Sequence, residues 1–447
     1  MKEYSKIVIV PPGPKAKEVL RRDKALISSS FTRVYPLVVE SGRGCIIRDV
    51  DGNEYIDFNS GIGVMNVGHC HPRVIDAIKK QAGKLLHYSY TDFYYEIVVE
   101  LARELSEITP GEFEKKVFFG NSGTESIEAG IKVAKWHTRK HRFLAFIGAF
   151  HGRTIGALSF TASKPAHRRY FFPLLPGVTH VPYPYCYRCP FRQTHPDCEY
   201  WCVDFIEDFV LKKYVPPEEV SAILFEPIQG EGGYIVPPPG YFGRLKKLAD
   251  KYNILLIDDE VQSGMGRTGR WFAIENWGIE PDVICIAKSV ASGLPLGATV
   301  AKADVMDWEP GSHASTFGGN PLSCAAALAV IKIIKEEKLL ENATKQGNYI
   351  LKRLREMQRK HVLIGDVRGK GLMIGMEIVN GKGGKEYGVR EAREIVVRSF
   401  KKGVALLPCG SSTIRVFPPL TITRDLIDKG LDIIEEAIKK VEREIPV

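Results

Sequence analysis

The chain has 447 residues, of which 44% are apolar and 26% are charged, and its formal net charge is +9. These values are those of a globular protein with a large core, and they exclude a disordered, collagen-like or small disulfide-stapled chain. Basic and acidic residues are interspersed, so a nucleic-acid partner is not indicated. No apolar run is long enough to span a bilayer, and residues 1–15 do not have the pattern of a secretion signal. We therefore expect a cytoplasmic protein without membrane segments.

Short apolar runs alternate along the chain with amphipathic segments, which is the pattern of an α/β domain with a mostly parallel sheet. Strands buried on both faces are expected at 117–119, 143–147, 222–225, 254–257 and 283–286. Helices are expected at 126–139 and 241–251, and apolar residues spaced three or four apart from Ile427 to Ile445 predict a final packing helix.

The domain prediction follows from where this alternation is found. Residues 61–330 contain it and are expected to form a large domain, with a cysteine-rich insertion at about 183–203. Residues 1–60 and 331–447 lack it, and we expect these two segments to build a second, smaller domain together.

Each predicted strand is followed directly by polar or glycine-rich residues. Ligands of open parallel sheets bind outside the carboxyl ends of the strands, so these segments are expected to line one crevice. They begin at Gly120, Gly148, Glu226, Asp258 and Ala287.

Ser122, Gly123 and Thr124 enter a predicted helix at the first of these strand ends. The free N–H groups of a helix N-terminus and the two hydroxyls could bind a phosphate. A simple helix cap is the alternative interpretation.

Asp259 and Lys288 carry the chemistry of two further strand ends. Neighbouring strand residues point to opposite faces, so only one of Asp258 and Asp259 can face the crevice. We expect Asp258 to pair instead with a covering helix. A partly desolvated lysine is a better nucleophile toward carbonyls because its pKa falls. A lysine, a carboxylate, an aromatic ring and a phosphate site are the parts that hold pyridoxal phosphate (PLP) as a Schiff base.

At this point the sequence resembles the class-III aminotransferases, the PLP enzymes of the ornithine and 4-aminobutyrate type. The resemblance rests on six motifs in family order, NSGTE, FHGRT, EPIQGEGG, DDEVQSGMGRTG, AKSVASGLPLGA and TFGGNP, and it runs from Asp49 to Leu420. It implies the fold-type-I architecture, with a large domain containing a mostly parallel sheet and a small α+β domain from both termini. It also implies a homodimer, or a dimer of dimers, with shared active sites.

The resemblance also assigns roles to individual residues. Lys288 would form the Schiff base and move the proton, and Asp259 would pair with the ring nitrogen. The other expected cofactor contacts are Gln262 at the ring hydroxyl, Phe150 stacked on the ring, His151 beside it, and Ser122, Gly123 and Thr124 at the phosphate with Thr316 of the partner subunit. Glu226 belongs to a family motif without a clear role.

Substrate recognition is expected at four positions. Arg415 matches the arginine that binds the α-carboxylate, and Glu231 matches the glutamate that pairs with this arginine when an ω-amino substrate binds. Arg153 matches the arginine that takes the distal carboxylate of 2-oxoglutarate or 4-aminobutyrate. Ile62 stands where 4-aminobutyrate enzymes carry Ile and ornithine enzymes carry Tyr, which favours 4-aminobutyrate or another ω-amino acid over ornithine or acetylornithine.

A departure from the family pattern keeps a second activity open. The segment from Lys288 to Gly293 reads KSVASG and resembles amino-acid racemases and epimerases of the same fold, whereas most family members carry Ser-Lys-Gly here. The Arg153, Glu231 and Arg415 set favours amino transfer to 2-oxoglutarate, and racemisation is the alternative.

Two further motifs are not explained by the resemblance to the aminotransferases. Gly264, Gly266 and Gly269 match a dinucleotide-binding spacing, but six residues, 258–263, separate the strand end from the first glycine, which argues against a nicotinamide enzyme. Cys186, Cys189, Cys198 and Cys202 could hold a structural zinc ion, form two local disulfides, or pack as thiols. No metal is expected in the chemistry itself.

Overall fold

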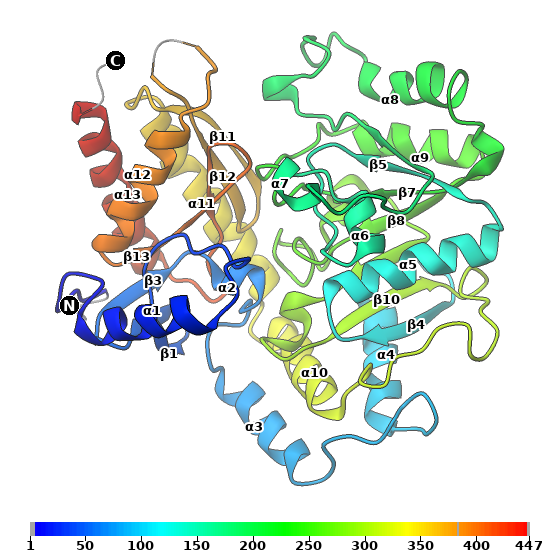
Figure 1. Cartoon of the computed structure of the whole chain (residues 1–447), viewed down its shortest axis with the longest axis horizontal. Coiled ribbons are helices and arrows are strands. Elements are labelled where there is room, and N and C mark those ends of the chain that lie inside the picture. The colour runs from blue at the N-terminus through cyan, green and yellow to red at the C-terminus, as the bar shows by residue number, and fades with distance from the viewer. Residues whose placement is uncertain (1–4, 382–383, 445–447) are drawn as a thin grey trace. The chain divides into compact units, whose positions relative to one another are not determined.

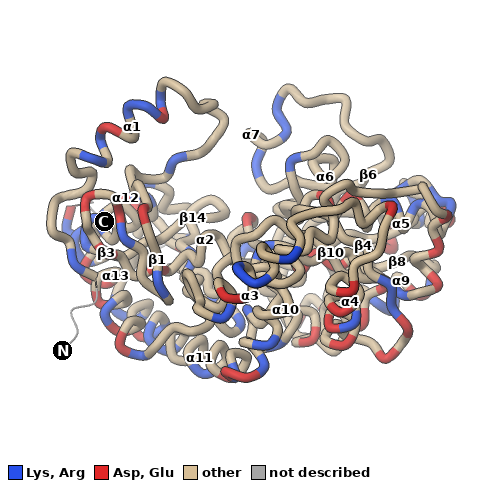
Figure 2. The backbone as a smooth tube through the Cα atoms, turned by 90° about the horizontal axis from the view of Figure 1, so that it is seen from below, with Lys and Arg blue, Asp and Glu red and all other residues tan. Residues whose placement is uncertain are grey.

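The computed structural model describes residues 5–381 and 384–444 and contains two compact units (Figure 1). One unit comprises Arg73–Leu340, and the other comprises Met1–Pro72 together with Glu341–Val447. None of the described helices is long and apolar enough to cross a membrane. In each unit the basic and acidic positions are interspersed (Figure 2).

The unit Arg73–Leu340 is built on a seven-stranded sheet with the order β4-β10-β9-β8-β7-β5-β6. Only β10 runs antiparallel to its neighbours, and the other six strands point the same way. The strands are β4 (Lys115–Gly120), β5 (Arg142–Phe146), β6 (Val178–Val181), β7 (Val220–Phe225), β8 (Leu255–Asp259), β9 (Val283–Ile286) and β10 (Gly297–Lys302). The five strands predicted from the sequence are confirmed, and β6 and β10 are additional.

Helices surround this sheet. They are α3 (Pro72–Ala82), α4 (Glu96–Ile108), α5 (Gly123–Thr138), α6 (Ile155–Phe160), α7 (Pro165–Arg168), α8 (Trp201–Phe205), α9 (Tyr241–Lys251) and α10 (Pro321–Glu336). Short helical turns are η1 (Cys186–Arg188), η2 (Ile206–Leu211), η3 (Pro217–Glu219), η4 (Ala273–Trp277) and η5 (Lys288–Ala291). The two helices predicted in this unit are confirmed as α5 and α9.

The core of this unit lies between α5 and the sheet, which α5 crosses (Figure 1). Ile127 and Ile131 of the helix are buried with Leu224, Ile257 and Cys285 of the strands. The helix lies close to the sheet at Gly130, where a Cβ atom would be 3.1 Å from the sulfur of Cys285. The N-terminus of α5 is therefore fixed relative to the strand ends beside it.

The second unit contains two four-stranded sheets, with the orders β1-β2-β3-β13 and β11-β12-β15-β14. Its strands are β1 (Val39–Arg43), β2 (Ile46–Asp49), β3 (Glu54–Asp57), β11 (Ile364–Lys370), β12 (Met373–Ile378), β13 (Val404–Ala405), β14 (Leu407–Cys409) and β15 (Thr413–Val416). Its helices are α1 (Pro14–Leu26), α2 (Ser60–Gly63), α11 (Leu339–Gln358), α12 (Val389–Lys401) and α13 (Arg424–Glu444). The predicted final helix is confirmed as α13, and Ile445 lies outside the described residues.

Candidate active site

The carboxyl ends of β4, β5, β7, β8 and β9 meet at one edge of the seven-stranded sheet, because these strands are parallel. This edge brings together most of the residues predicted from the sequence. They are Ser122, Gly123 and Thr124 after β4, Phe150, His151 and Arg153 after β5, Glu231 after β7, Asp259 and Gln262 at the end of β8, and Lys288 after β9.

Asp259 and His151 form a buried pair at this edge. Nδ1 of His151 lies 2.7 Å from Oδ2 of Asp259, and both residues are almost completely buried. The second oxygen, Oδ1, accepts a hydrogen bond from the backbone N–H of Val261 at 3.0 Å. The carboxylate is thus held in one orientation from both sides.

Glu226 lies beside this pair. One of its oxygens accepts the backbone N–H of Phe150 at 2.9 Å, and the other accepts that of Gly230 at 2.8 Å. Burial raises the pKa of Glu226 to about 7, which His151 opposes and Asp259 reinforces. The motif signalled that Glu226 matters, but its partners are backbone groups and could not be read from the sequence.

The N-terminus of α5 forms a polar cradle after β4. Ser122 is its N-cap and accepts the N–H of Glu125 at 3.3 Å, and the hydroxyls of Thr124 and Thr154 are 2.8 Å apart. Gly152 packs directly against this turn, since a Cβ atom there would lie 2.3 Å from the hydroxyl oxygen of Thr124. Both interpretations of Ser122 fit this geometry, because capping one N–H leaves the others of the first turn available.

Lys288 has an unusual backbone conformation. Its φ is +48°, in the left-handed region, at the start of η5, and Ala287 alone separates it from β9. Non-glycine residues are uncommon there and cost about 1–3 kcal/mol, and such residues cluster at functional sites. The strand next to β9 carries Asp259, whose register partner is Cys285.

Two basic side chains lie against the ring of Phe150. The guanidinium carbon of Arg153 is 5.4 Å from the centre of its ring, and the His167 ring meets it edge-on at 5.6 Å. Burial lowers the pKa of His167, and the nearby charges of Arg153 and Lys164 lower it further. Lys164 lies 3.7 Å from Glu231.

His167 and Lys164 were not identified from the sequence. The sequence feature that could have indicated them is the run of basic residues around α7, whose Lys and Arg positions are blue in Figure 2.

The structure contradicts the ion pair expected between Asp258 and a covering helix. It is fully buried, and neither of its carboxylate oxygens has a hydrogen-bond partner within residues 5–381 and 384–444. The predicted ion pair with a covering helix is therefore wrong. Burial raises the pKa of Asp258 well above its usual range, and the carboxylates of Glu260 and Asp259 add to this effect.

Three predicted residues lie away from these strand ends in the chain. Thr316 is exposed between β10 and α10, next to Ser315, whose hydroxyl oxygen accepts the side-chain N–H of Asn121 at 3.1 Å. Arg415 is buried on β15 and donates to the carbonyl oxygen of Pro408 at 3.0 Å. Ile62 lies in α2 with a φ of +65° and an exposed side chain.

The four cysteines of the insertion line one small surface cavity with a volume of about 20 Å³. All four are free thiols in the structure. Burial raises the pKa of Cys202 to about 12, and the other three thiols add to this effect. Among the described residues, no group of three or more His, Cys, Asp or Glu side chains is arranged to hold a metal ion.

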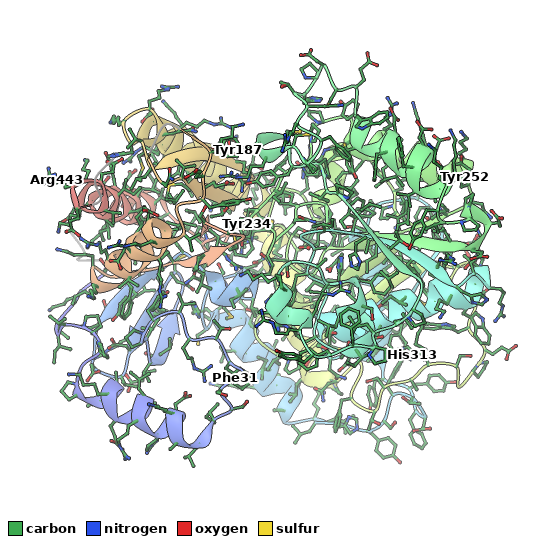
Figure 3. All side chains as sticks on the ribbon, turned by 45° about the horizontal axis from the view of Figure 1, so that its top comes forward. Phe31, Tyr187, Tyr234, Tyr252, His313 and Arg443 are labelled. Atoms are coloured by element: carbon green, nitrogen blue, oxygen red, sulfur yellow. The ribbon has the colours of Figure 1, made fainter. Side chains whose placement is uncertain are left out.

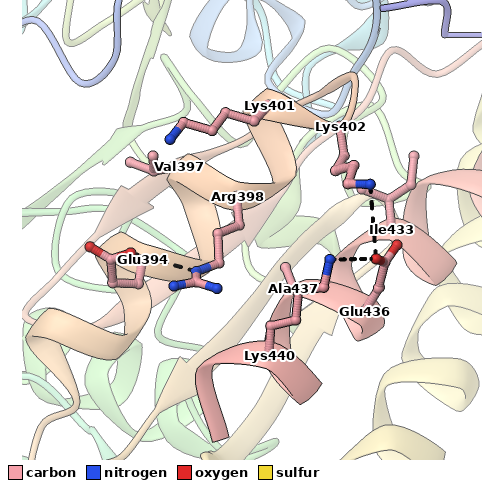
Figure 4. A pocket seen from close by; sticks show the side chains of 9 residues that line it. All are labelled: Glu394, Val397, Arg398, Lys401, Lys402, Ile433, Glu436, Ala437 and Lys440. Carbon is pink, nitrogen blue, oxygen red and sulfur yellow. Dashed lines mark ion pairs between the residues drawn. The ribbon is translucent and has the colours of Figure 1, made fainter. Parts of the chain in front are cut away.

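The glycine motif, the loop around Tyr234 and the groove between α12 and α13 do not resemble a catalytic site. Gly264, Gly266 and Gly269 lie in turns that lead into the short η4 rather than into an α-helix. Tyr234, labelled in Figure 3, is fully buried in the loop after β7. A groove of about 320 Å³ between α12 and α13 is lined by ion-paired side chains, such as Lys440 with Glu436, and contains none of the predicted site residues (Figure 4).

Comparison with known proteins decides the family. The model of the class-III aminotransferases matches residues 27–438. The chain belongs to the class-III aminotransferase family. It is 42% identical to an alanine/serine racemase of Pyrococcus horikoshii, over 99% of this chain and 95% of the relative. It is also 40% identical to a 5-aminovalerate aminotransferase of Pseudomonas aeruginosa, over 95% of this chain and 99% of the relative.

The fold comparison agrees. The crystal structure of an ornithine aminotransferase from Toxoplasma gondii superposes with a TM-score of 0.85 and 31% identity, covering 96% of each chain. The expected fold-type-I class is confirmed, and the enzyme is PLP-dependent like its family. A nicotinamide enzyme is excluded by this assignment.

The residues at the sheet edge fit PLP. Oε1 of Gln262 and Nε2 of His151 are buried without a hydrogen-bond partner in the described part of the chain. Such polar atoms carry a cost unless a bound group satisfies them. Together with the polar cradle at α5 and the lysine after β9, they supply the hydrogen-bonding atoms and the amine that this cofactor needs.

Proposed function

We propose that this enzyme moves the amino group of an ω-amino acid resembling 4-aminobutyrate, or of an α-amino acid, to 2-oxoglutarate. The observation that carries this proposal is the position of Arg153 beside Phe150. It sets a guanidinium, the group best suited to bind a carboxylate, 5.4 Å from the ring expected to stack on the cofactor. The 5-aminovalerate aminotransferase relative supports an ω-amino donor.

In this proposal Lys288 would hold PLP covalently, and Phe150 and His151 would be the residues that contact its ring. Asp259 stays next to the ring nitrogen, and its pairing with His151 fixes the carboxylate there. Gln262 contacts the ring hydroxyl through its unpaired Oε1. The phosphate is bound by Ser122, Gly123 and Thr124, with Thr316 contributed by a second copy of the chain in a cytoplasmic homodimer.

The chemistry then depends on proton transfer by Lys288. The bound cofactor supplies an electron sink for the carbon that loses its proton. Lys288 would take that proton and return it on the cofactor side, and water must then release the keto acid before the amino group can pass to the acceptor. Asp259 favours the protonated ring nitrogen because a fixed negative charge stabilises a nearby cation.

The substrate contacts follow from the resemblance. Arg153 binds the distal carboxylate, and Arg415 binds the α-carboxylate. By the resemblance, Glu231 would pair with Arg415 when an ω-amino acid is the donor, and Ile62 would contribute to substrate recognition. Lys164, 3.7 Å from Glu231, is a second cation that acts on the same carboxylate.

Racemisation is the second candidate. The observation that favours it is the 42% identity to the alanine/serine racemase over nearly the whole chain. A racemase returns the proton to the substrate carbon from the opposite face and needs no keto acid. Lys288 serves both reactions, so the residues around it do not separate them.

One experiment distinguishes the two activities. The purified PLP-loaded enzyme is incubated with single L-amino acids and with 4-aminobutyrate and 5-aminovalerate, each with and without 2-oxoglutarate, and the products are resolved on a chiral column. Glutamate formed only when 2-oxoglutarate is present supports the proposal. A D-amino acid formed without any keto acid would make racemisation the primary activity.

A further inference from the structure

Glu226 joins two loops that both belong to the candidate active site. Its Oε1 accepts the backbone N–H of Phe150, in the loop after β5, and its Oε2 accepts that of Gly230, in the loop after β7. The residue follows β7 directly and is only 4% exposed. Water therefore does not replace either contact.

Titratable groups among the described residues lie around Glu226. His151 comes from the loop after β5, and Asp259 from the end of β8. Tyr183, after β6, donates its hydroxyl hydrogen to the backbone carbonyl of Glu226 at 2.8 Å. Of these groups, only His151 can carry a positive charge.

We propose that Glu226 is a positioning residue that clamps the Phe150 loop to the 226–233 loop, and that its protonation releases the clamp. The proposal depends on the proposed function only for its effect on catalysis. The clamp itself is a property of the protein chain.

The clamp depends on the protonation of Glu226 because protonation changes how well its oxygens accept hydrogen bonds. An ionised carboxylate accepts hydrogen bonds at both oxygens, whereas a protonated one turns one oxygen into a donor. The protonated oxygen is a weaker acceptor than a carboxylate oxygen, so its hydrogen bond from the backbone N–H would weaken. Because burial raises the pKa of Glu226 to about 7, the clamp is complete above this pH and weakens below it.

The clamp acts on both sides of the proposed site. Phe150 is the ring expected to stack on the cofactor, and Glu231 follows Gly230 directly. The loops are also linked by the side-chain N–H of Gln229, which donates to the carbonyl oxygen of Ile147 at 3.0 Å. Release of Glu226 would therefore loosen the loops without separating them.

Glu226→Gln tests the clamp, and Glu260→Gln is the matched control. Glu260 is also a buried carboxyl with two accepted hydrogen bonds, from the Ser263 hydroxyl and the Ile274 N–H, and burial raises its pKa to about 8. Neither bond involves the Phe150 or Gly230 loop. Both variants replace one carboxylate oxygen with a donating amide.

Hydrogen exchange of the apoenzyme, read by mass spectrometry and corrected for intrinsic rates, measures the clamp without any substrate. In Glu226→Gln, exchange in peptides covering 148–154 and 226–233 should rise about tenfold, the size expected for one lost hydrogen bond to a charged acceptor. In Glu260→Gln the change should appear around residue 274 instead. Equal exchange in the two loops of wild type and Glu226→Gln would overturn the proposal.

The pH response separates Glu226 from its neighbours. Wild-type protection of these two loops should fall between pH 8 and pH 6, and Glu226→Gln should show the low value at both. A fall of the same size in Glu226→Gln would assign the response to the His151–Asp259 pair and overturn the proposal. Glu226→Asp keeps the charge but is one methylene shorter, so it should lose part of the protection and retain the pH response.

The absorbance of bound PLP extends the test to the loaded enzyme. Its change with pH should shift in Glu226→Gln and not in Glu260→Gln, since of these two carboxyls only Glu226 accepts the N–H of Phe150. If the proposed substrate is wrong but the clamp is right, the exchange and absorbance results stand while the amino-acid panel fails. If exchange does not change, the clamp is refuted whatever the substrate.

Discussion

Replacing Arg153 by alanine should weaken the use of 2-oxoglutarate much more than the use of pyruvate. Arg153 is exposed, and its guanidinium lies 5.4 Å from the centre of the Phe150 ring, so it can reach a ligand on that ring without breaking a buried contact. Pyruvate has no distal carboxylate and does not need this arginine. The variant should fold normally, because surface substitutions usually change stability by less than about 0.5 kcal/mol.

The size of the effect follows from the contact that would be lost. Hydrogen bonds to a charged group contribute about 1.5–3 kcal/mol, and solvent exposure of Arg153 favours the lower half of this range. Since about 1.4 kcal/mol corresponds to tenfold in rate, kcat/KM for 2-oxoglutarate should fall roughly 10- to 40-fold.

The assay measures steady-state kcat/KM for both keto acids with one fixed amino donor. Arg153→Lys is the control variant, because it keeps the charge but loses the paired N–H groups, and it should retain part of the preference. Equal losses for 2-oxoglutarate and pyruvate would refute the role of Arg153 at the distal carboxylate.

Two further predictions concern the buried strand ends. Gly152→Ala should destabilise the enzyme and weaken its affinity for PLP, because Gly152 has a φ of +137° and a Cβ atom would lie 2.3 Å from the hydroxyl oxygen of Thr124. Fluorescence titration of the apoenzyme with PLP measures the affinity. Gly243→Ala is the control, because a Cβ atom there meets nothing within 4 Å. Unchanged affinity in Gly152→Ala would contradict a role of the polar cradle at α5 in binding PLP. Asp258→Asn should be stabilising, and increasingly so at higher pH: the raised pKa means that the folded enzyme keeps a proton that the unfolded chain loses above its own pKa. The advantage measured by denaturant unfolding should grow as the pH rises above the ordinary pKa of an aspartate. An advantage that does not depend on pH would mean that Asp258 is ionised in the folded enzyme.

The sequence predicted the large sheet well because its strands are continuous apolar runs. The run Val283–Ile286 was predicted with the same bounds as β9. β10, Gly297–Lys302, was missed because Gly and Ala give no strong strand signal, and its antiparallel direction depends on its neighbours β4 and β9.

The candidate site could be predicted only where side chains carry the pattern. Asp259 ends the apolar strand β8 and Lys288 comes just after β9, and the parallel pairing of these two strands puts both residues at the same edge of the sheet. The partners of Glu226 are backbone N–H groups from two loops, which no spacing of side chains encodes. The error at Asp258 has a similar cause, since the alternation of a strand predicts which face a residue takes but not what covers it.

The most direct test of the account is the site of covalent attachment of PLP. The purified enzyme is loaded with PLP, reduced with borohydride, digested and mapped by mass spectrometry. The account predicts a stable pyridoxyl label on Lys288 alone, with Lys288→Ala unlabelled and inactive. A label on another lysine, or full activity in Lys288→Ala, would contradict it.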